Sequence, residues 1–255
     1  MEVNSYNGEF GYELISTIPY AYYLHTKGML RKTISGHDTE HLYYFSPKHE
    51  INPEPRSWYN VVKMDTPNND IHKSKLDLSQ FAPPPYKQTY SGYYDYDMVV
   101  CNRYNDEWPG NPELNKPINY FSLDFLFDLF TKNDNKKIAY LNIHGYEKHY
   151  DNAPAIDLGD YEFCKHFKNV DHIKDLSIKK DSLNWNQLAV MASAKEFYTL
   201  NGGYAVLASY FGGTNYIYTN PEIAGGRIYP RELETGDFTY YHHFGGSKIV
   251  LRNPW

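Results

Sequence analysis

The sequence predicts an α/β protein in which parallel sheets are flanked by helices. Short β-branched or aromatic runs alternate with longer stretches of helical periodicity, as in proteins whose strands are joined by helices. The order is clearest in the second half, where strands and helices alternate over residues 137–143, 183–194, 196–200, 204–211 and 215–218. A βαβ unit with a right-handed crossover is therefore the expected arrangement of that half.

The first elements follow the same alternation. Residues 2–6 are expected to form a strand, and residues 13–29 a helix whose apolar side chains fall near one face. The apolar run LYYF at residues 42–45 is expected to be the second strand.

Prolines in the middle of the chain divide it into two parts. They recur over residues 47–90, and Pro83, Pro84 and Pro85 stand in a row that no helix interior or central strand accommodates. A stiff crossing there predicts one lobe over residues 1–90 and a second over residues 91–255. The second lobe is expected to begin with a strand at residues 98–101 and a strongly apolar helix at residues 123–130.

Length, charge and hydropathy exclude several classes of protein. The 255 residues suffice for large hydrophobic cores, and a net charge of −6 with dispersed basic residues argues against a nucleic-acid partner. No apolar run approaches the ~20 residues that span a bilayer. The amino terminus lacks a basic segment followed by an apolar core, so we expect a cytoplasmic protein. Cys101 and Cys164 stand outside any zinc or disulfide pattern.

Tyrosine is unusually abundant, with 27 of the 255 residues. Its amphipathic ring suits clefts that bind sugars, because it stacks on apolar ring faces and keeps a hydroxyl group for hydrogen bonds. The alternative is that most of these rings simply pack at strand edges.

The late segment FYTLNGGYAVLASYFGG combines a strand, a glycine turn and a helix. Asn201, Gly202 and Gly203 form the turn, and Tyr204 opens the helix. Free N–H groups at a helix amino terminus attract anions, and glycines let a phosphate approach the backbone. The pattern indicates a phosphate or diphosphate ligand, with a tight strand-to-helix connection that binds nothing as the alternative.

Two other strand ends carry polar residues. Residues 98–101 lead into Asn102, Arg103 and Asp106, and a parallel strand delivers such residues to the crevice where α/β proteins bind ligands. Arg103 is suited to clamp phosphate oxygens, or it pairs with Asp106 at the surface. Near the amino terminus, the turn GEFGYE brackets Glu9 and Glu13, of which one is a candidate general base and the other complements the helix dipole.

These three segments resemble fucosyltransferase-like glycosyltransferases of the GT-B superfamily. The run GEFGYELISTIPYAYYLHTKG looks like the glycine turn and helix that open that group, where Asn-Gln stands in place of Tyr12 and Glu13. The run VVCNRYNDEW is similar to its strand-end arginine motif, although Asn102 precedes Arg103 without a His-x-Arg run. The run FYTLNGGYAVLASYFGGTNYIY resembles a late βαβ segment that is shared more widely by GT-B enzymes.

The resemblance implies a GT-B-like fold of two Rossmann-like lobes, with residues 1–90 on the acceptor side and residues 91–255 binding the nucleotide sugar. It implies an inverting, metal-independent transferase that moves a sugar, with fucose or rhamnose favoured, from a nucleotide-diphosphate donor to a glycan or carbohydrate acceptor, without a cofactor. The catalytic candidates are Glu9, Glu13 and Asp106. The donor-binding candidates are Gly8, Phe10, Gly11, Asn102, Arg103, Asn201, Gly202, Gly203 and Tyr204.

Other motifs and functions carry less weight. Asp95 and Asp97 form a DxD sequence, but they precede a strand, whereas the metal-holding DxD of GT-A transferases follows one. No metalloprotease, nucleophile-elbow or P-loop motif is present in the sequence. The functional alternatives are a non-catalytic carbohydrate-binding protein and a transferase for another activated group, such as pyruvyl.

Overall fold

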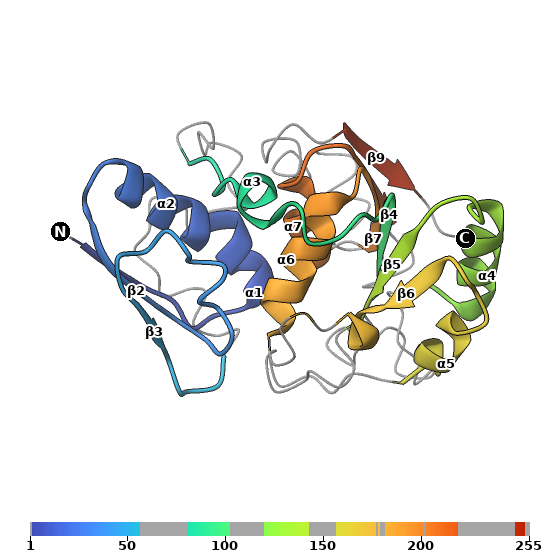
Figure 1. Ribbon diagram of the computed structural model, residues 1–255. Helices are drawn as coiled ribbons and strands as arrows, with labels where there is room; N and C mark the ends of the chain where they lie inside the picture. Colours follow the sequence, from blue (N-terminus) through green and yellow to red (C-terminus); the bar gives the residue numbers. More distant parts are fainter. Residues whose placement is uncertain are drawn as a thin grey trace.

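The protein forms two parallel β-sheets flanked by helices (Figure 1). The computed structural model describes residues 2–56, 81–102, 120–142, 157–176, 178, 182–200, 202–218 and 248–252. The first sheet has the order β1-β2-β3 and the second the order β6-β5-β4-β7-β8-β9, and every pair of neighbours is parallel. The strands are Glu2–Ser5 (β1), Leu30–Ser35 (β2), His49–Ile51 (β3), Met98–Cys101 (β4), Ile138–Leu141 (β5), Val170–His172 (β6), Glu196–Leu200 (β7), Thr214–Tyr218 (β8) and Lys248–Arg252 (β9).

The helices join these strands. A continuous helical segment follows β1 and consists of α1 (Phe10–Tyr12), the π-helical turn η1 (Glu13–Thr17) and α2 (Ile18–Thr26). The other α-helices are α3 (Tyr86–Tyr90), α4 (Leu123–Lys132), α5 (Asp160–Cys164), α6 (Leu183–Ser193) and α7 (Gly203–Ser209). Among the described residues, no helix is both long and apolar enough to cross a membrane.

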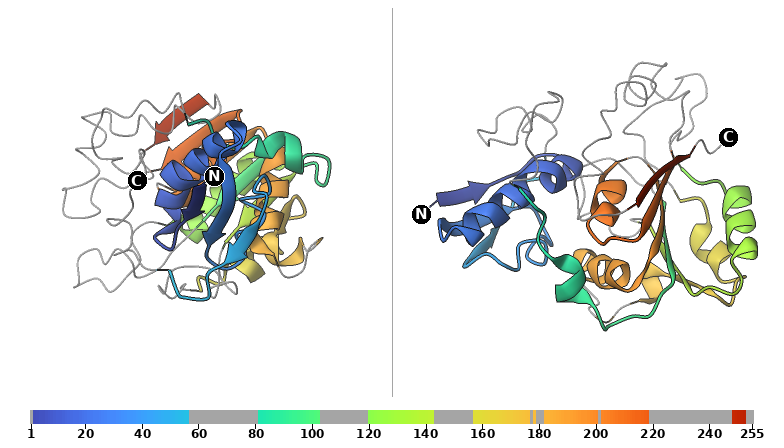
Figure 2. Two further views of the ribbon diagram at one scale, coloured as in Figure 1. Left: turned by 90° about the vertical axis from the view of Figure 1, so that its left-hand side faces the viewer. Right: turned by 90° about the horizontal axis from the view of Figure 1, so that it is seen from above.

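The second sheet is doubly wound. The chain adds β5 and β6 on one side of β4, then returns to add β7, β8 and β9 on the other. Alternate residues of β4 and β5 pack into two different cores, one with α6 and α7 and one with α4, so helices cover opposite faces (Figure 2). Both strands are buried along their whole length, as strands covered on two faces require. The order of strands reverses between β4 and β7, which is the topological switch point of this sheet.

The predicted α/β class with parallel sheets and flanking helices is confirmed, and the strand at residues 196–200 is confirmed to the residue. The strand predicted at residues 42–45 is wrong, because those residues form turns in which Leu42 and Tyr43 donate to the carbonyl group of Thr39. The second strand is instead β2, whose sequence LRKTIS alternates buried and more exposed residues. The adjacent charged residues Arg31 and Lys32 interrupt its apolar pattern, so the sequence gives no clear strand signal there.

One continuous hydrophobic core joins the first sheet with its helices, the N-terminal lobe, to the second sheet with its helices, the C-terminal lobe. The predicted crossing at the three prolines leads into α3, which packs against α6. The hydroxyl groups of Tyr86 and Tyr90 donate to the carbonyl oxygens of Leu42 and His41 at 2.7 and 2.6 Å. The Lys87 ammonium donates to the Phe211 carbonyl at 3.0 Å. The segment after the prolines is therefore hydrogen-bonded to both lobes and connects them.

Candidate functional site

The switch point of the second sheet lies between β4 and β7, so the candidate site is at the carboxyl ends of these two strands. In open parallel sheets, ligands bind in the crevice outside the strand ends where the order reverses. Strand β4 ends at Cys101 and leads into Asn102, and β7 ends at Leu200, two residues before Gly202. Two of the three segments singled out in the sequence therefore leave neighbouring strands at the same edge.

The third segment meets this edge from the N-terminal lobe. A Cβ atom placed on Gly203 would lie 3.3 Å from Cδ1 of Phe10 and 3.7 Å from the Cα and N atoms of Gly11. Helices α1 and α7 accordingly contact each other, although nearly 200 positions separate them in the chain. Two glycine turns, residues 8–11 and residues 202–203, thus lie face to face between the lobes, and the absence of a side chain on Gly203 permits this close approach.

Glu9 caps the first helix with its own carboxylate. Its Oε1 accepts from the backbone N–H of Gly11 at 2.8 Å, and its Oε2 from that of Tyr12 at 2.9 Å. The Tyr6 hydroxyl group donates to the Glu9 carbonyl oxygen at 2.7 Å, which fixes the turn from the strand side. Glu9 is only partly buried. Two helix N–H groups of the kind that would bind an anion are therefore already bonded to a carboxylate.

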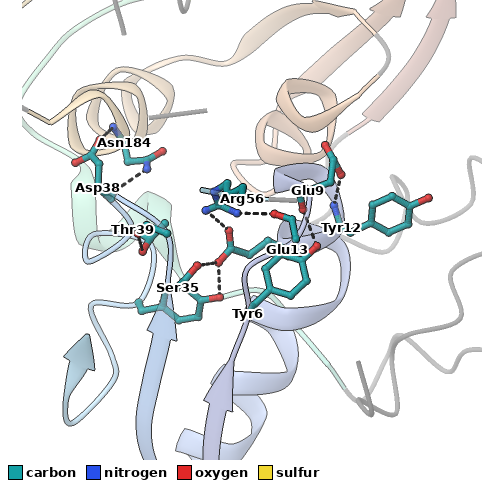
Figure 3. A network of polar contacts seen from close by, with 12 residues as sticks. Tyr6, Glu9, Tyr12, Glu13, Ser35, Asp38, Thr39, Arg56 and Asn184 are labelled. Carbon is teal, nitrogen blue, oxygen red and sulfur yellow. Dashed lines mark hydrogen bonds and ion pairs between the residues drawn. The ribbon is translucent and has the colours of Figure 1, made fainter. Parts of the chain in front are cut away.

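Glu13 lies in a buried polar network (Figure 3). One of its oxygens accepts from the hydroxyl groups of Ser35 and Tyr43, the second bond being 2.7 Å. The other oxygen accepts from the guanidinium group of Arg56 at 2.6 Å, and the Glu13 side chain has no solvent exposure. Burial and the neighbouring carboxylate both raise the pKa of Tyr43, so its hydroxyl group stays protonated and remains a donor.

The π-helical turn explains how Tyr210 joins this network. In the π register, the Ile18 N–H bonds to the Glu13 carbonyl five residues back, and Pro19 in the next position has no N–H for the Leu14 carbonyl. The hydroxyl group of Tyr210, just after α7, donates to that carbonyl oxygen instead. The helices that follow the two glycine turns are thereby joined to each other.

Arg56 is the functional candidate that sequence reasoning missed. Besides its ion pair with Glu13, it donates to the Gly8 carbonyl oxygen at 3.1 Å, and its guanidinium carbon lies 5.6 Å from the centre of the Phe10 ring. A Cβ atom on Gly36 would come within 2.8 Å of its Nε, so the glycine makes room for it. Arg56 follows a proline-containing loop with no local signal, and only the tertiary structure brings it to residues 8–10.

A second contact between the lobes lies at the end of β2. Asp38, whose φ of 58° is unusual for a residue other than glycine, accepts from the Asn184 N–H at 2.8 Å, and its carbonyl oxygen accepts from the Asn184 side chain at 2.6 Å. Burial raises the pKa of Asp38 to about 6, against the opposing effect of the bond from Asn184. Asp38 and Ser182 together cap α6.

Asn102 connects three segments of the C-terminal lobe. Its amide group donates to the Phe121 carbonyl oxygen at 3.0 Å and to the Tyr140 hydroxyl oxygen at 2.8 Å, and its Oδ1 accepts from the Phe121 N–H at 2.8 Å. Tyr140 in turn donates to Asp160 at 2.7 Å. Asn102 is fully buried, so in this structure its side chain stabilises the end of β4, and its part in donor binding stays a prediction.

The structure brings together several of the predicted site residues. Phe10, Gly11 and Gly203 form the contact between the turns, Gly202 precedes it and Tyr204 is buried at the start of α7. Gly8 lies in the first turn, where its carbonyl oxygen accepts from Arg56. Arg103, Asp106 and Asn201 lie outside the described residues.

The two aspartates of the DxD sequence lie at the other edge of the sheet, before β4. Asp95 pairs with the Lys137 ammonium, and Asp97 accepts from the Lys137 N–H at 2.9 Å. Within the described part of the chain, no group of three or more His, Cys, Asp or Glu side chains is arranged to hold a metal ion.

Comparison of the chain with models of protein families, with curated proteins and with solved structures found no match. The functional assignment therefore rests on the site itself.

Proposed function

We propose that the protein is a glycosyltransferase that binds a nucleotide-diphosphate sugar at the switch point between β4 and β7 and transfers the sugar, with inversion, to a glycan or carbohydrate acceptor. The observation that carries the proposal is the meeting of two glycine turns, from two parallel sheets, at the carboxyl ends of their strands. A donor held at the edge of one lobe then faces the other lobe, from which the acceptor approaches.

In this proposal the C-terminal lobe stabilises the leaving diphosphate. Arg103 follows β4, and the turn of residues 201–203 follows β7, so both leave neighbouring strands at one edge. An arginine and backbone N–H groups stabilise the charge that builds on the leaving group as the glycosidic bond to the donor breaks. No metal ion is required for this role, and the DxD pair at the opposite edge is bonded to Lys137.

The candidate general bases differ in their surroundings. Glu13 is enclosed by Ser35, Tyr43 and Arg56 without solvent exposure, so we give it a structural role. Glu9 is partly exposed beside the facing turn, so in the proposal Glu9 or Asp106 removes the proton from the acceptor hydroxyl group. A Glu9→Gln variant then keeps nucleotide binding and loses transfer.

The first test is a thermal-shift screen with GDP, UDP, ADP and dTDP and their sugars, each with Mg²⁺ and with EDTA. A ligand that binds only the folded state raises the midpoint by mass action. We expect a shift with one nucleotide that EDTA does not change and that the Arg103→Ala variant abolishes. Arg31→Ala, at an exposed arginine of β2, is the matched control and is expected to keep the shift.

The absence of a shift with every nucleotide at millimolar concentration would contradict the donor site. Retention of glycan binding by Arg103→Ala, in a protein that binds no nucleotide, would instead indicate a non-catalytic carbohydrate-binding protein. The described tyrosines do not favour that alternative, since many of them are buried in the core: Tyr6, Tyr43, Tyr86, Tyr90, Tyr96, Tyr140, Tyr204 and Tyr210.

A further inference from the structure

We propose that Arg56 is a positioning residue: held by Glu13, it fixes the turn of residues 8–11 in the orientation that faces Gly203. The proposal rests on the proposed function, because the turn faces Gly203 at the proposed nucleotide site. Arg56 belongs to no recognised sequence motif, and it lies 43 positions from Glu13 and 48 positions from Gly8 in the chain.

The cost of burying this arginine is the first argument. A guanidinium group and a carboxylate taken out of water lose hydration, and the attraction between them repays this loss only with good geometry and further hydrogen bonds. Apolar side chains of similar size often serve folding equally well at such a site. The Arg56–Glu13 pair, with side-chain exposures of 5% and 0%, therefore calls for a role besides stability.

The direction of its bonds is the second argument. One terminal nitrogen of Arg56 binds Glu13, and the other donates to the carbonyl oxygen of Gly8, the first residue of the turn. The planar guanidinium group also lies 5.6 Å from the centre of the Phe10 ring, within the range of a cation–π contact. Arg56 thus contacts two residues of the turn.

The contact across the lobes is the third argument. The Phe10 ring and the Gly11 backbone, from the other lobe, are the groups that a Cβ atom on Gly203 would meet. A displacement of the turn would therefore move the surface that α7 faces. Phe10 is held between Arg56 and Gly203, so the guanidinium group acts on the site through the turn and needs no contact with a substrate.

The shape of the neighbouring residue fits this role. Gly36 closes the other side of Arg56, where a Cβ atom would come within 2.8 Å of Nε and 3.2 Å of Cζ. The φ angle of Gly36 is not positive, so an alanine there would strain no backbone and would act only by pressing on the guanidinium group. Gly36→Ala therefore displaces Arg56 without changing any charge.

The central experiment removes both charges together. The double variant Glu13→Gln/Arg56→Met leaves no uncompensated buried charge, and Arg31→Met serves as a control of the same chemistry at an exposed site. The first measurement is the dissociation constant of the nucleoside diphosphate that stabilises the wild type, by titration calorimetry. The second is hydrogen exchange at the N–H groups of Gly11 and Tyr12, with those of Ile138–Leu141 in β5 as an internal reference.

We expect the double variant to fold, to bind the nucleotide at least tenfold more weakly and to exchange faster at Gly11 and Tyr12, with no change in β5. Arg56→Lys should recover the pair with Glu13 but not the simultaneous bond to Gly8, so its affinity should fall between wild type and double variant. If the double variant does not fold, Gly36→Ala carries the same two measurements and the same expectations.

Affinity within twofold of wild type and unchanged exchange would overturn the positioning role and leave the proposed function intact. If the wild type binds no nucleoside diphosphate, the proposed function fails instead, and exchange alone decides the positioning role. Faster exchange confined to residues 11 and 12 then supports it, and exchange equal to that of wild type overturns it.

Discussion

The two glycine turns that meet between the lobes each carry two glycines, but they differ in structure. The first is enclosed by side chains: Glu9 bonds to its N–H groups, and Arg56 holds its first carbonyl group. The second begins with Gly202, whose φ of 133° is a conformation that favours glycine. Gly202 is also the N-cap residue of α7, and it has no side chain with which to cap the helix. The first turn is thus fixed by polar side chains, and the second by backbone shape.

Because of this difference, we expect the two turns to have different roles. A turn whose N–H groups already bind a carboxylate is a rigid surface, whereas a turn of two glycines lets a ligand approach its backbone closely. We therefore expect substitutions at the first turn to act chiefly on stability and orientation. Substitutions at the second turn should act on contact between the lobes and on ligand binding.

The largest effect should come from breaking the ion pair behind the first turn. Arg56→Met alone leaves the Glu13 carboxylate buried without its partner, which should cost about 3–5 kcal/mol of unfolding free energy. Glu13→Gln/Arg56→Met should cost about 2 kcal/mol or less, since no charge is left alone. Urea unfolding measures both values. Equal losses in the single and double variants would show that charge burial is not the cause.

The next effect concerns the other contact between the lobes, at Asp38. Its folded pKa of about 6 lies above its unfolded value, so the folded state binds the proton more tightly. The stability that this group contributes is complete below about pH 4 and is lost as the pH rises through 6, a change of roughly 2–3 kcal/mol at most.

Asp38→Asn should remove this dependence while tolerating the positive φ, which asparagine adopts readily. Unfolding free energies measured between pH 4 and 7 test the expectation, with the exposed Asp134→Asn variant as control. An unchanged slope in Asp38→Asn would contradict it.

Enlarging the second turn should separate the lobes. Gly203→Val places a branched side chain against Phe10 and Gly11 and should cost roughly 1–3 kcal/mol, because overpacking displaces well-packed groups. Gly203→Ala is the matched control: its Cβ meets one ring atom at 3.3 Å, and a gain in helix propensity of about 1 kcal/mol offsets the contact. Equal stability of the valine and alanine variants would argue against a close contact.

The smallest effect should come from the cap of the first helix. Glu9→Ala removes both bonds to the N–H groups of Gly11 and Tyr12 and should cost about 1 kcal/mol, the usual value of an N-cap. Ser122→Ala, at the N-cap of α4, gives the reference for a cap outside the contact between the two glycine turns. A Glu9→Ala cost several times larger than the Ser122→Ala cost would show that the carboxylate does more than cap.

Local patterns predicted the elements whose residues are buried on regular periods. The strand of residues 196–200 and the helix beginning at Leu183 follow from apolar spacing. The prediction placed the second strand at residues 42–45 and missed β2, because β2 carries charged side chains although it is the central strand of its sheet, and the apolar residues Leu42 and Tyr43 are buried in a turn. The π-helical turn of residues 13–17 has no periodic signal that distinguishes it from an α-helix.

The sequence by itself determined the α/β class and the parallel sheets, and it marked two glycine turns that lie next to each other in space. These follow from local periodicity and from the backbone freedom of glycine, and both of these signals depend only on residues close together in the sequence. Only the tertiary structure decided that Glu13 is enclosed and that Arg56 and Asp38 join distant segments. The partners of a buried charge are chosen by chain packing across many residues, and no local pattern encodes that choice.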